Sequence, residues 1–177
     1  MGIKSSPSPG LSWSAMRKVL EQENICASLK GRIQYFATRY RGAHDQTGRV
    51  AIRLDGKEIL KSDCFDWSAK QHDIWSEITA NTEGKISYLE FSESINTHVQ
   101  NQGGIGQYAF YRAFHAYHNS SIDESLQSLY PLVRLLAILD KRVGKRRLQK
   151  LVSEVEAQPE WLQPFYQLRM EADGITM

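Results

Sequence analysis

The sequence predicts an α+β fold with an N-terminal helix, a three-stranded antiparallel meander and a helical C-terminal half. Two observations lead to this prediction. Residues 31–42 and 49–61 alternate between apolar and polar side chains, and the second run contains an Asp55-Gly56 turn signal, as a β-hairpin does. From about Asp66 onward, apolar residues recur three or four positions apart, which is the spacing of one helix face. Strands followed by helices favour α+β over α/β architecture.

Length and composition fit a single globular domain. The chain has 177 residues, of which 41% are hydrophobic and 24% charged, close to ordinary globular values. We expect residues 11–177 to form one α+β domain, and residues 1–10, with serine, proline and glycine but little to bury, to form a disordered tail. The net charge of +2, from 22 basic and 20 acidic residues, is too small for bulk attraction of nucleic acid. Any such binding must come from a local patch.

Cysteine usage and hydropathy indicate the compartment. Cys26 and Cys64 form neither a dense disulfide framework nor a CxxC pair for zinc. The lysine near the N-terminus is not followed by an apolar run, and no apolar stretch approaches the roughly 20 residues that span a bilayer. We therefore expect a cytoplasmic protein with no membrane partner.

The first helix is expected to begin after Ser12, because a serine hydroxyl can accept a hydrogen bond from the first helical turn. It is expected to end near Asn24. The apolar side chains on its buried face recur at helical spacing and are Trp13, Met16 and Leu20, with Val19 beside them.

The strand register follows from the turn residues. Residues 43–48 supply a turn after the first strand, and Asp55-Gly56 supplies the two positive φ angles of a tight hairpin. Counting outward from that hairpin gives the pairs Leu54 with Lys57, Arg53 with Glu58, Ile52 with Ile59, and Ala51 with Leu60. Because side chains alternate between faces, the residues expected on the core face are Val50, Ile52, Leu54 and Ile59.

The second half contains a series of helical patterns. These cover residues 68–80, 87–100, 106–119 and 121–130, with a flexible break at 101–106. Phe110, Phe114 and Tyr117 lie on one helical stripe that is most simply core. Pro131 suits the first position of a helix. The run from Leu132 to Asp140 is apolar nearly all round, which predicts the central helix of the fold.

The segment from Leu139 to Lys150 carries six basic side chains in twelve residues. The preceding helix either runs on through Gly144 or stops there, with a second helix from Lys145. In both cases helical geometry directs one set of residues to the core: Leu148, Leu151, Val152 and Val155. The candidate residues for contacting phosphate or another partner are directed outward or sideways and are Arg142, Lys145, Arg146, Arg147 and Lys150.

Histidine patterns give weaker candidates. The His44-Asp45 pair occurs in metal-dependent phosphohydrolases, but its place between Ala43 and Gly48 favours a type I turn. His115 and His118 lie three positions apart on a predicted helix and could share a metal with His98 or with a cysteine. No carboxylate stands at a recognised spacing beside them, so a packed or solvent-facing pair is favoured.

Catalytic nucleophiles and cofactor motifs have little support. The sequence has no G-x-S-x-G motif, and the Gly103–Gly106 segment lacks the Lys-Ser/Thr that follows in a phosphate-binding loop. Cys64 stands near Asp63 and Asp66, whose carboxylates disfavour a thiolate. We therefore assign no catalytic residue, no cofactor and no metal.

The predicted sheet carries a second group of basic side chains. Guanidinium groups among aromatic rings can contact phosphates while bases stack, but a wet sheet face with paired charges is the simpler interpretation. The residues concerned are Arg32, Arg39, Arg41, Arg49 and Arg53, interleaved with Tyr35, Phe36 and Tyr40.

Four segments together resemble a family of small uncharacterised bacterial proteins. They are SWSAMRKVLEQ, LKGRIQYFATRYRGAHDQTGRVAIRLDGKEI, LVRLLAILDKRVGKRRLQKL and PEWLQPFYQLRMEADGI. The resemblance extends over about residues 11 to 173. It implies a shared fold and a cytoplasmic bacterial protein, and it carries no catalytic assignment.

Three classes of function remain open at this point. The expected one is a non-enzymatic binding or interaction module whose basic helix contacts phosphate or nucleic acid, or a protein partner. The alternatives are an enzyme acting on a phosphorylated or nucleic-acid substrate, and an accessory protein that neutralises another protein.

Overall fold

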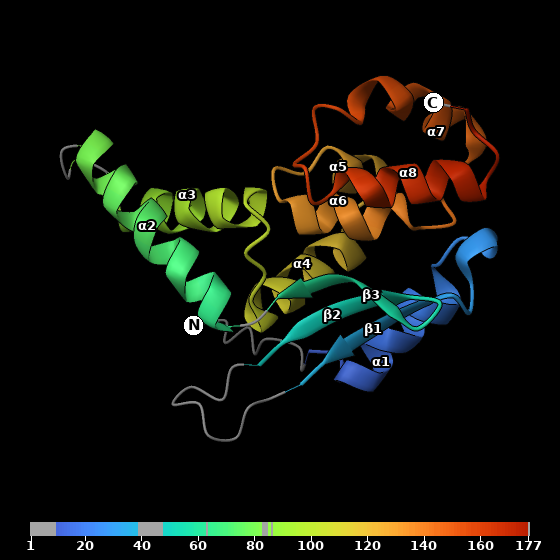
Figure 1. Cartoon of the computed structure of the whole chain (residues 1–177), viewed down its shortest axis with the longest axis horizontal. Coiled ribbons are helices and arrows are strands. Elements are labelled where there is room, and N and C mark those ends of the chain that lie inside the picture. Colours follow the sequence, from blue (N-terminus) through green and yellow to red (C-terminus); the bar gives the residue numbers. More distant parts are fainter. Residues whose placement is uncertain (1–9, 39–47, 63, 83–84, 86, 177) are drawn as a thin grey trace, which may run out of the picture.

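The computed structural model describes residues 10–38, 48–62, 64–82, 85 and 87–176 and has the predicted α+β fold (Figure 1). The strands are β1 (Ile33–Ala37), β2 (Val50–Leu54) and β3 (Lys57–Ser62). The helices are α1 (Trp13–Lys18), α2 (Cys64–Thr82), α3 (Tyr88–Asn101), α4 (Gln107–Asn119), α5 (Ile122–Leu126), α6 (Pro131–Ile138), α7 (Lys145–Leu151) and α8 (Gln163–Ala172). The predicted tail and the predicted turn at 43–48 lie, except for their last residues, outside the described residues.

The sheet is the predicted antiparallel meander, in the order β1-β2-β3. Asp55 and Gly56 have φ angles of 50° and 81°, so the hairpin uses the two left-handed residues that its tight turn requires. Next to the turn, Leu54 pairs with Lys57 and Arg53 with Glu58, as predicted.

Beyond these two pairs the predicted register is wrong. The register shifts between Ile52 and Arg53, so that Ile52 pairs with Leu60 and Ala51 with Lys61. A bulge of this kind adds one residue to β3, and Ile59 is the residue left between the two registers. Ile59 is consequently 40% exposed, whereas Leu60 is 8% exposed and fills the core face that the sequence assigned to Ile59.

The N-terminal helix begins as predicted. The Ser12 hydroxyl accepts a hydrogen bond from the backbone N–H of Ala15 at 3.3 Å. A wider helical turn, Val19–Glu23, continues α1 and ends directly before Asn24. Trp13 packs against Phe110 of α4 with ring centroids 6.0 Å apart, which fixes α1 on the core.

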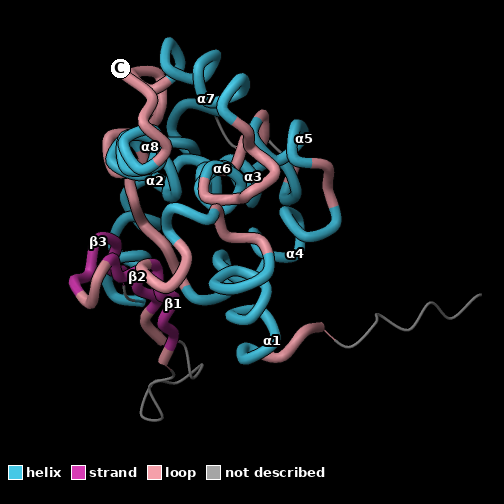
Figure 2. The backbone as a smooth tube through the Cα atoms, turned by 90° about the vertical axis from the view of Figure 1, so that its right-hand side faces the viewer, coloured by secondary structure: helices cyan, strands magenta, loops and turns pink. Residues whose placement is uncertain are grey.

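The main core is built in layers around α4 and α6 (Figures 1 and 2). Tyr35 of β1 packs against Phe110 of α4, with ring centroids 5.9 Å apart, so α4 covers the sheet. On the other side of α4 lies α6, and α8 packs on α6. Every described side chain of α6 except Arg134 is buried, which confirms that α6 is the central helix.

A second, smaller cluster holds α2 against α3. Its buried members are Ile74, Ile78, Ile95 and Val99. Figure 1 shows this pair extending from the side of the molecule, away from the sheet and from α8. Trp75 of α2 contacts Phe91 of α3 edge to face but remains 48% exposed. We refer to α2 and α3 together as the helical arm.

The chain does not continue as one helix through Gly144. Helix α6 ends at Ile138, and Gly144 is the N-cap of α7 with an ordinary φ of −78°. Two backbone hydrogen bonds hold the intervening loop: Cys26 donates to Leu139, and Lys141 donates to Asn24. Of the two alternatives open from the sequence, the interrupted helix is therefore the one adopted.

Candidate functional site

Helix α7 is fixed by its apolar side. Leu148 is fully buried, and Leu151 and Val155 are each 5% exposed, as predicted, while Val152 is only partly buried. Since helical residues are spaced 100° apart, the side opposite Leu148 and Leu151 presents Arg146 and Lys150, with Lys145 beside them. Figure 2 shows α7 at the end of the molecule opposite α1 and the sheet.

Arg142 is held in a structural ion pair. Its Nε and Nη2 atoms donate to Oδ2 of Asp140 at 3.0 and 2.8 Å, and its backbone N–H donates to Oδ1 at 2.7 Å. The guanidinium also lies 5.5 Å from the centroid of the Tyr117 ring. Hydrogen bonding to Asp140 raises the pKa of Arg142. The charge of this guanidinium is thus already paired within the protein.

Asp140 is the centre of a buried polar group. Its carboxylate, whose side chain is fully buried, accepts a short hydrogen bond from the Tyr117 hydroxyl. The Tyr117 oxygen accepts in turn from Nδ2 of Asn24 at 3.0 Å. Burial, followed by the adjacent Asp140, raises the pKa of Tyr117. The group joins the end of α1, α4 and the loop before α7, and its role is to fix that loop.

Arg147 is the second paired member of the predicted set. Its Nη2 atom donates to Oδ2 of Asp123 at 2.8 Å, and its Nη1 atom donates to the carbonyl oxygen of Arg142 at 3.1 Å. These bonds connect α7 to α5 and to the preceding loop. Both side chains are substantially exposed, so the pair orients α7 more than it stabilises the fold.

The three remaining side chains have no ion pair or side-chain hydrogen bond within the described residues, and we call them the basic cluster: Lys145, Arg146 and Lys150. All three are exposed. Two acids of neighbouring segments are already paired with other arginines, since Asp140 binds Arg142 and Asp123 binds Arg147. The structure thus separates the five predicted residues into two that are paired and three that are free to meet a partner.

Sequence reasoning missed Arg169, which is 2% exposed. Its Nη1 atom donates to the carbonyl oxygens of Ile138 and Asp140, and its Nη2 atom donates to that of Val143 at 2.7 Å. Its Nε atom donates to Asp173 at 3.0 Å. Arg169 therefore binds the last carbonyl of α6 and two carbonyls of the loop that leads to α7. The only signal in the sequence was the four-residue spacing between Arg169 and Asp173, which is typical of an ion pair on a helix. This spacing does not indicate that Arg169 also binds backbone carbonyls.

The histidine candidates lie on two helices. His98 of α3 has its Nδ1 atom 2.8 Å from the carbonyl oxygen of Ser94, whereas His115 and His118 of α4 both pack on the Phe114 ring. In the described part of the chain, no three His, Cys, Asp or Glu side chains come together in a way that could hold a metal ion. The His44-Asp45 pair and the Cys64 side chain lie outside what the structure describes.

The sheet arginines that the structure describes are paired. Arg32 donates to Asp55 at 2.7 Å and lowers the pKa of that carboxyl. Arg49 and Arg53 both contact Glu58, and the Arg53 guanidinium lies over the Phe36 ring. This arrangement fits the interpretation of a sheet face with paired charges. The other members of that group, Arg39, Tyr40 and Arg41, lie outside the described residues.

The fold and the site define the class: an α+β protein with a helical arm and with an exposed basic cluster on a short helix that is anchored to the core. No helix in the described part of the chain is long and apolar enough to cross a membrane. The chain belongs to the SF0329 protein family, whose model matches residues 12–170. Comparison with curated proteins and with solved structures gave no significant match.

Proposed function

We propose that this protein is a non-enzymatic binding module that contacts the phosphate groups of nucleic acid through the basic cluster. The observation that carries the proposal is the position of three exposed, unpartnered cations on one short helix.

Two of these cations stand at the end of α7 where the helix dipole disfavours them, whereas Lys150 lies in the last turn, where the dipole favours it. Lys145 and Arg146 occupy the first turn, which is the positive end of the helix dipole, and no acidic residue is present there. Arg146 and Lys150 are four residues apart, so their like charges repel along the helix face. A bound polyanion would offset the unfavourable dipole interaction of Lys145 and Arg146 and the repulsion between Arg146 and Lys150. These unfavourable interactions in the free protein support a role in binding over a role in folding.

The surroundings of the cluster favour phosphate over a protein partner. Protein interfaces are centred on apolar and aromatic side chains. Among the described residues, the large hydrophobic side chains with the greatest exposure lie on other segments and are Leu11, Ile59, Trp75, Leu89, Tyr108 and Leu129. Attraction at α7 therefore comes from charge alone, which is the sequence-independent component of nucleic-acid binding.

The cluster is also held in place before any ligand arrives. Leu148 and Leu151 are buried, Arg147 is bonded to Asp123, and the loop before α7 is fixed by Arg142 and Arg169. A rigid support reduces the entropy lost on binding.

The proposed setting is the cytoplasm of a bacterium. The family resemblance drawn from the sequence supports a bacterial origin. Cys26 is a buried free thiol, which fits a reducing compartment.

The test is fluorescence anisotropy with a labelled DNA duplex of mixed sequence at low salt. Replacing the basic cluster by alanine (K145A/R146A/K150A) should weaken binding strongly and about equally for unrelated duplex sequences. The matched control removes three exposed lysines from elsewhere (K30A/K57A/K61A), with the same loss of charge, and should retain most of the affinity. Equal loss in both variants would mean that net charge, not this cluster, governs binding. Absence of binding by the native chain would refute the proposal.

A further inference from the structure

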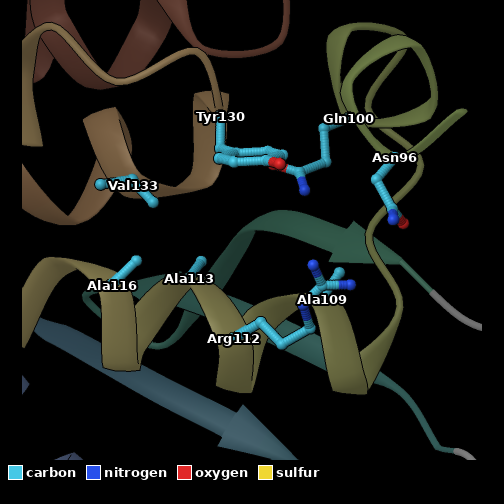
Figure 3. A pocket seen from close by; sticks show the side chains of 8 residues that line it. All are labelled: Asn96, Gln100, Ala109, Arg112, Ala113, Ala116, Tyr130 and Val133. Carbon is cyan, nitrogen blue, oxygen red and sulfur yellow. The ribbon is translucent and has the colours of Figure 1, made fainter. Parts of the chain in front are cut away.

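A cavity of about 170 Å³ lies between α3, α4 and α6 (Figure 3). It is separate from the basic cluster, and nothing argued above assigns it a role. For scale, a cavity of about 150 Å³ accommodates a benzene ring. The space therefore suits a small organic molecule and not a nucleotide.

Short side chains leave this space open. Ala109, Ala113 and Ala116 are spaced four and three residues apart, so they share one face of α4, which lines the cavity. Val133 of α6 lines the opposite side (Figure 3). The alanine methyl groups make this wall of the cavity apolar. Because they are small they leave the space open, and a larger side chain at Ala113 would fill it.

A buried amide reaches into the cavity from α3. Gln100 is 5% exposed, and its Oε1 atom accepts a hydrogen bond from the backbone N–H of Leu132 at 3.4 Å. The backbone carbonyl of Gln100 accepts from Nε1 of Trp161 at 2.7 Å, so the residue is held at both ends. Its Nε2 atom, assigned by the Leu132 contact, points into the cavity in Figure 3 and has no acceptor among the described residues. Although the residue is mostly buried, this N–H group is accessible from the cavity and is therefore available to an acceptor that enters it.

A cation stands at the opening. Arg112 of α4 is exposed and has no ion pair within the described residues. Figure 3 shows its guanidinium extending along α4 toward the side of the cavity where Asn96 lies. None of the residues that line the cavity is an acid, so nothing there neutralises this charge. Tyr130 contributes a hydroxyl group from the start of α6.

We infer that this cavity binds a small organic carboxylate with a compact apolar body. The Arg112 guanidinium offers the planar pair of N–H donors that a carboxylate accepts, and the Gln100 amide supplies a further donor. The apolar body lies against Ala113, Ala116 and Val133. The largely apolar lining and the single guanidinium disfavour inorganic phosphate, which has no apolar part and a higher charge.

Such a ligand would bridge the helical arm and the main core. Gln100 and Asn96 belong to α3, whereas Arg112 and Val133 belong to α4 and α6. Because binding stabilises the state that contacts the ligand on both sides, α3 should exchange its amide hydrogens more slowly when the cavity is filled.

The test is a titration of the ¹⁵N-labelled full chain with benzoate and with 3-methylbutanoate, followed by two-dimensional NMR. Saturable shifts of the Gln100 and Ala113 amides in the millimolar range support the inference. R112Q should weaken the affinity for the carboxylate at least about tenfold. Benzamide, the neutral analogue, should bind the native chain and R112Q equally. R146Q, which removes a guanidinium from the basic cluster, should change nothing.

Further measurements test whether the ligand binds inside the cavity and whether it is recognised as a carboxylate. A113L should abolish binding of benzoate and benzamide by filling the cavity, and its spectrum shows whether it folds. R112Q alters an exposed side chain and so tests the inference independently of that repacking. Shifts at these amides with inorganic phosphate but not with either carboxylate would overturn the inference. So would unchanged affinity in R112Q, or the absence of any saturable shift with both carboxylates.

Discussion

Tyr117 of α4 donates its hydroxyl hydrogen to the buried carboxylate of Asp140, two residues beyond the end of α6. Arg142 binds the same carboxylate from the solvent side. Tyr117 thus fixes the start of the loop that leads from α6 into α7. The position of the basic cluster on α7 therefore depends on the buried hydrogen bond between Tyr117 and Asp140.

Replacing Tyr117 by phenylalanine should lower the free energy of unfolding by about 1.5–3 kcal/mol, because it removes a hydrogen bond to a buried charged group. Tyr166 provides a matched control, because its buried hydroxyl has no hydrogen-bond partner in the described part of the chain. Y166F should be neutral or slightly stabilising. Urea unfolding of both variants at neutral pH is the measurement, and a larger loss in Y166F than in Y117F would contradict this arrangement.

Stability should also fall at alkaline pH. Burial raises the pKa of Tyr166 to about 12 and raises the pKa of Tyr117 as well, whereas an unfolded tyrosine ionises near pH 10. These groups therefore stabilise the fold fully below about pH 10, and the contribution is lost as pH rises through the folded-state pKa. The urea midpoint should decline steeply between about pH 10 and 12. The decline should be shallower in Y166F, and an equally steep decline in that variant would show that Tyr166 does not contribute.

Arg169 should be among the most sensitive positions for stability. R169M removes the buried guanidinium that binds three backbone carbonyls and takes the ion-pair partner from Asp173, so we expect a loss of about 3–5 kcal/mol. R32M, which breaks the exposed pair with Asp55, should change stability little. The comparison is made by thermal unfolding. Similar melting temperatures for the two variants would mean that the carbonyl contacts of Arg169 contribute little.

The bulge in β3 gives a direct test of the sheet register. Leu60 is 8% exposed and Ile59 is 40% exposed. L60S should therefore cost about 2 kcal/mol or more, whereas I59S should cost well under half of that. The unbulged register requires the opposite order. Chemical denaturation of the two variants distinguishes the registers.

The sequence was sufficient for the elements whose signals are local. The Asp55-Gly56 turn, the Ser12 cap and the nearly continuous apolar run of α6 each depend on a few neighbouring residues, and the structure has all three. The bulge was not predictable, because counting outward from a turn assumes that each residue has one partner. What places Leu60 inward is its packing against the core, which involves residues distant in sequence.

The sequence predicted which basic residues make up the candidate site, but not which of them form ion pairs within the protein. The six cations of the basic segment are evident from the sequence, and helical periodicity correctly placed Leu148 and Leu151 inward. The pairing of Arg147 with Asp123, 24 residues away, depends on how α5 and α7 pack. The cavity beside Gln100 was also missed, because it exists only where three helices meet.

The dependence of DNA affinity on salt concentration tests the central claim most directly. Each phosphate contact contributes about 0.9 to the slope of log K against log salt concentration. If Lys145, Arg146 and Lys150 each contact a phosphate, K145A/R146A/K150A should reduce the magnitude of that slope by roughly 3, and the control K30A/K57A/K61A should leave it nearly unchanged. A slope that is the same in the native chain and in the cluster variant would contradict the assignment of phosphate binding to α7.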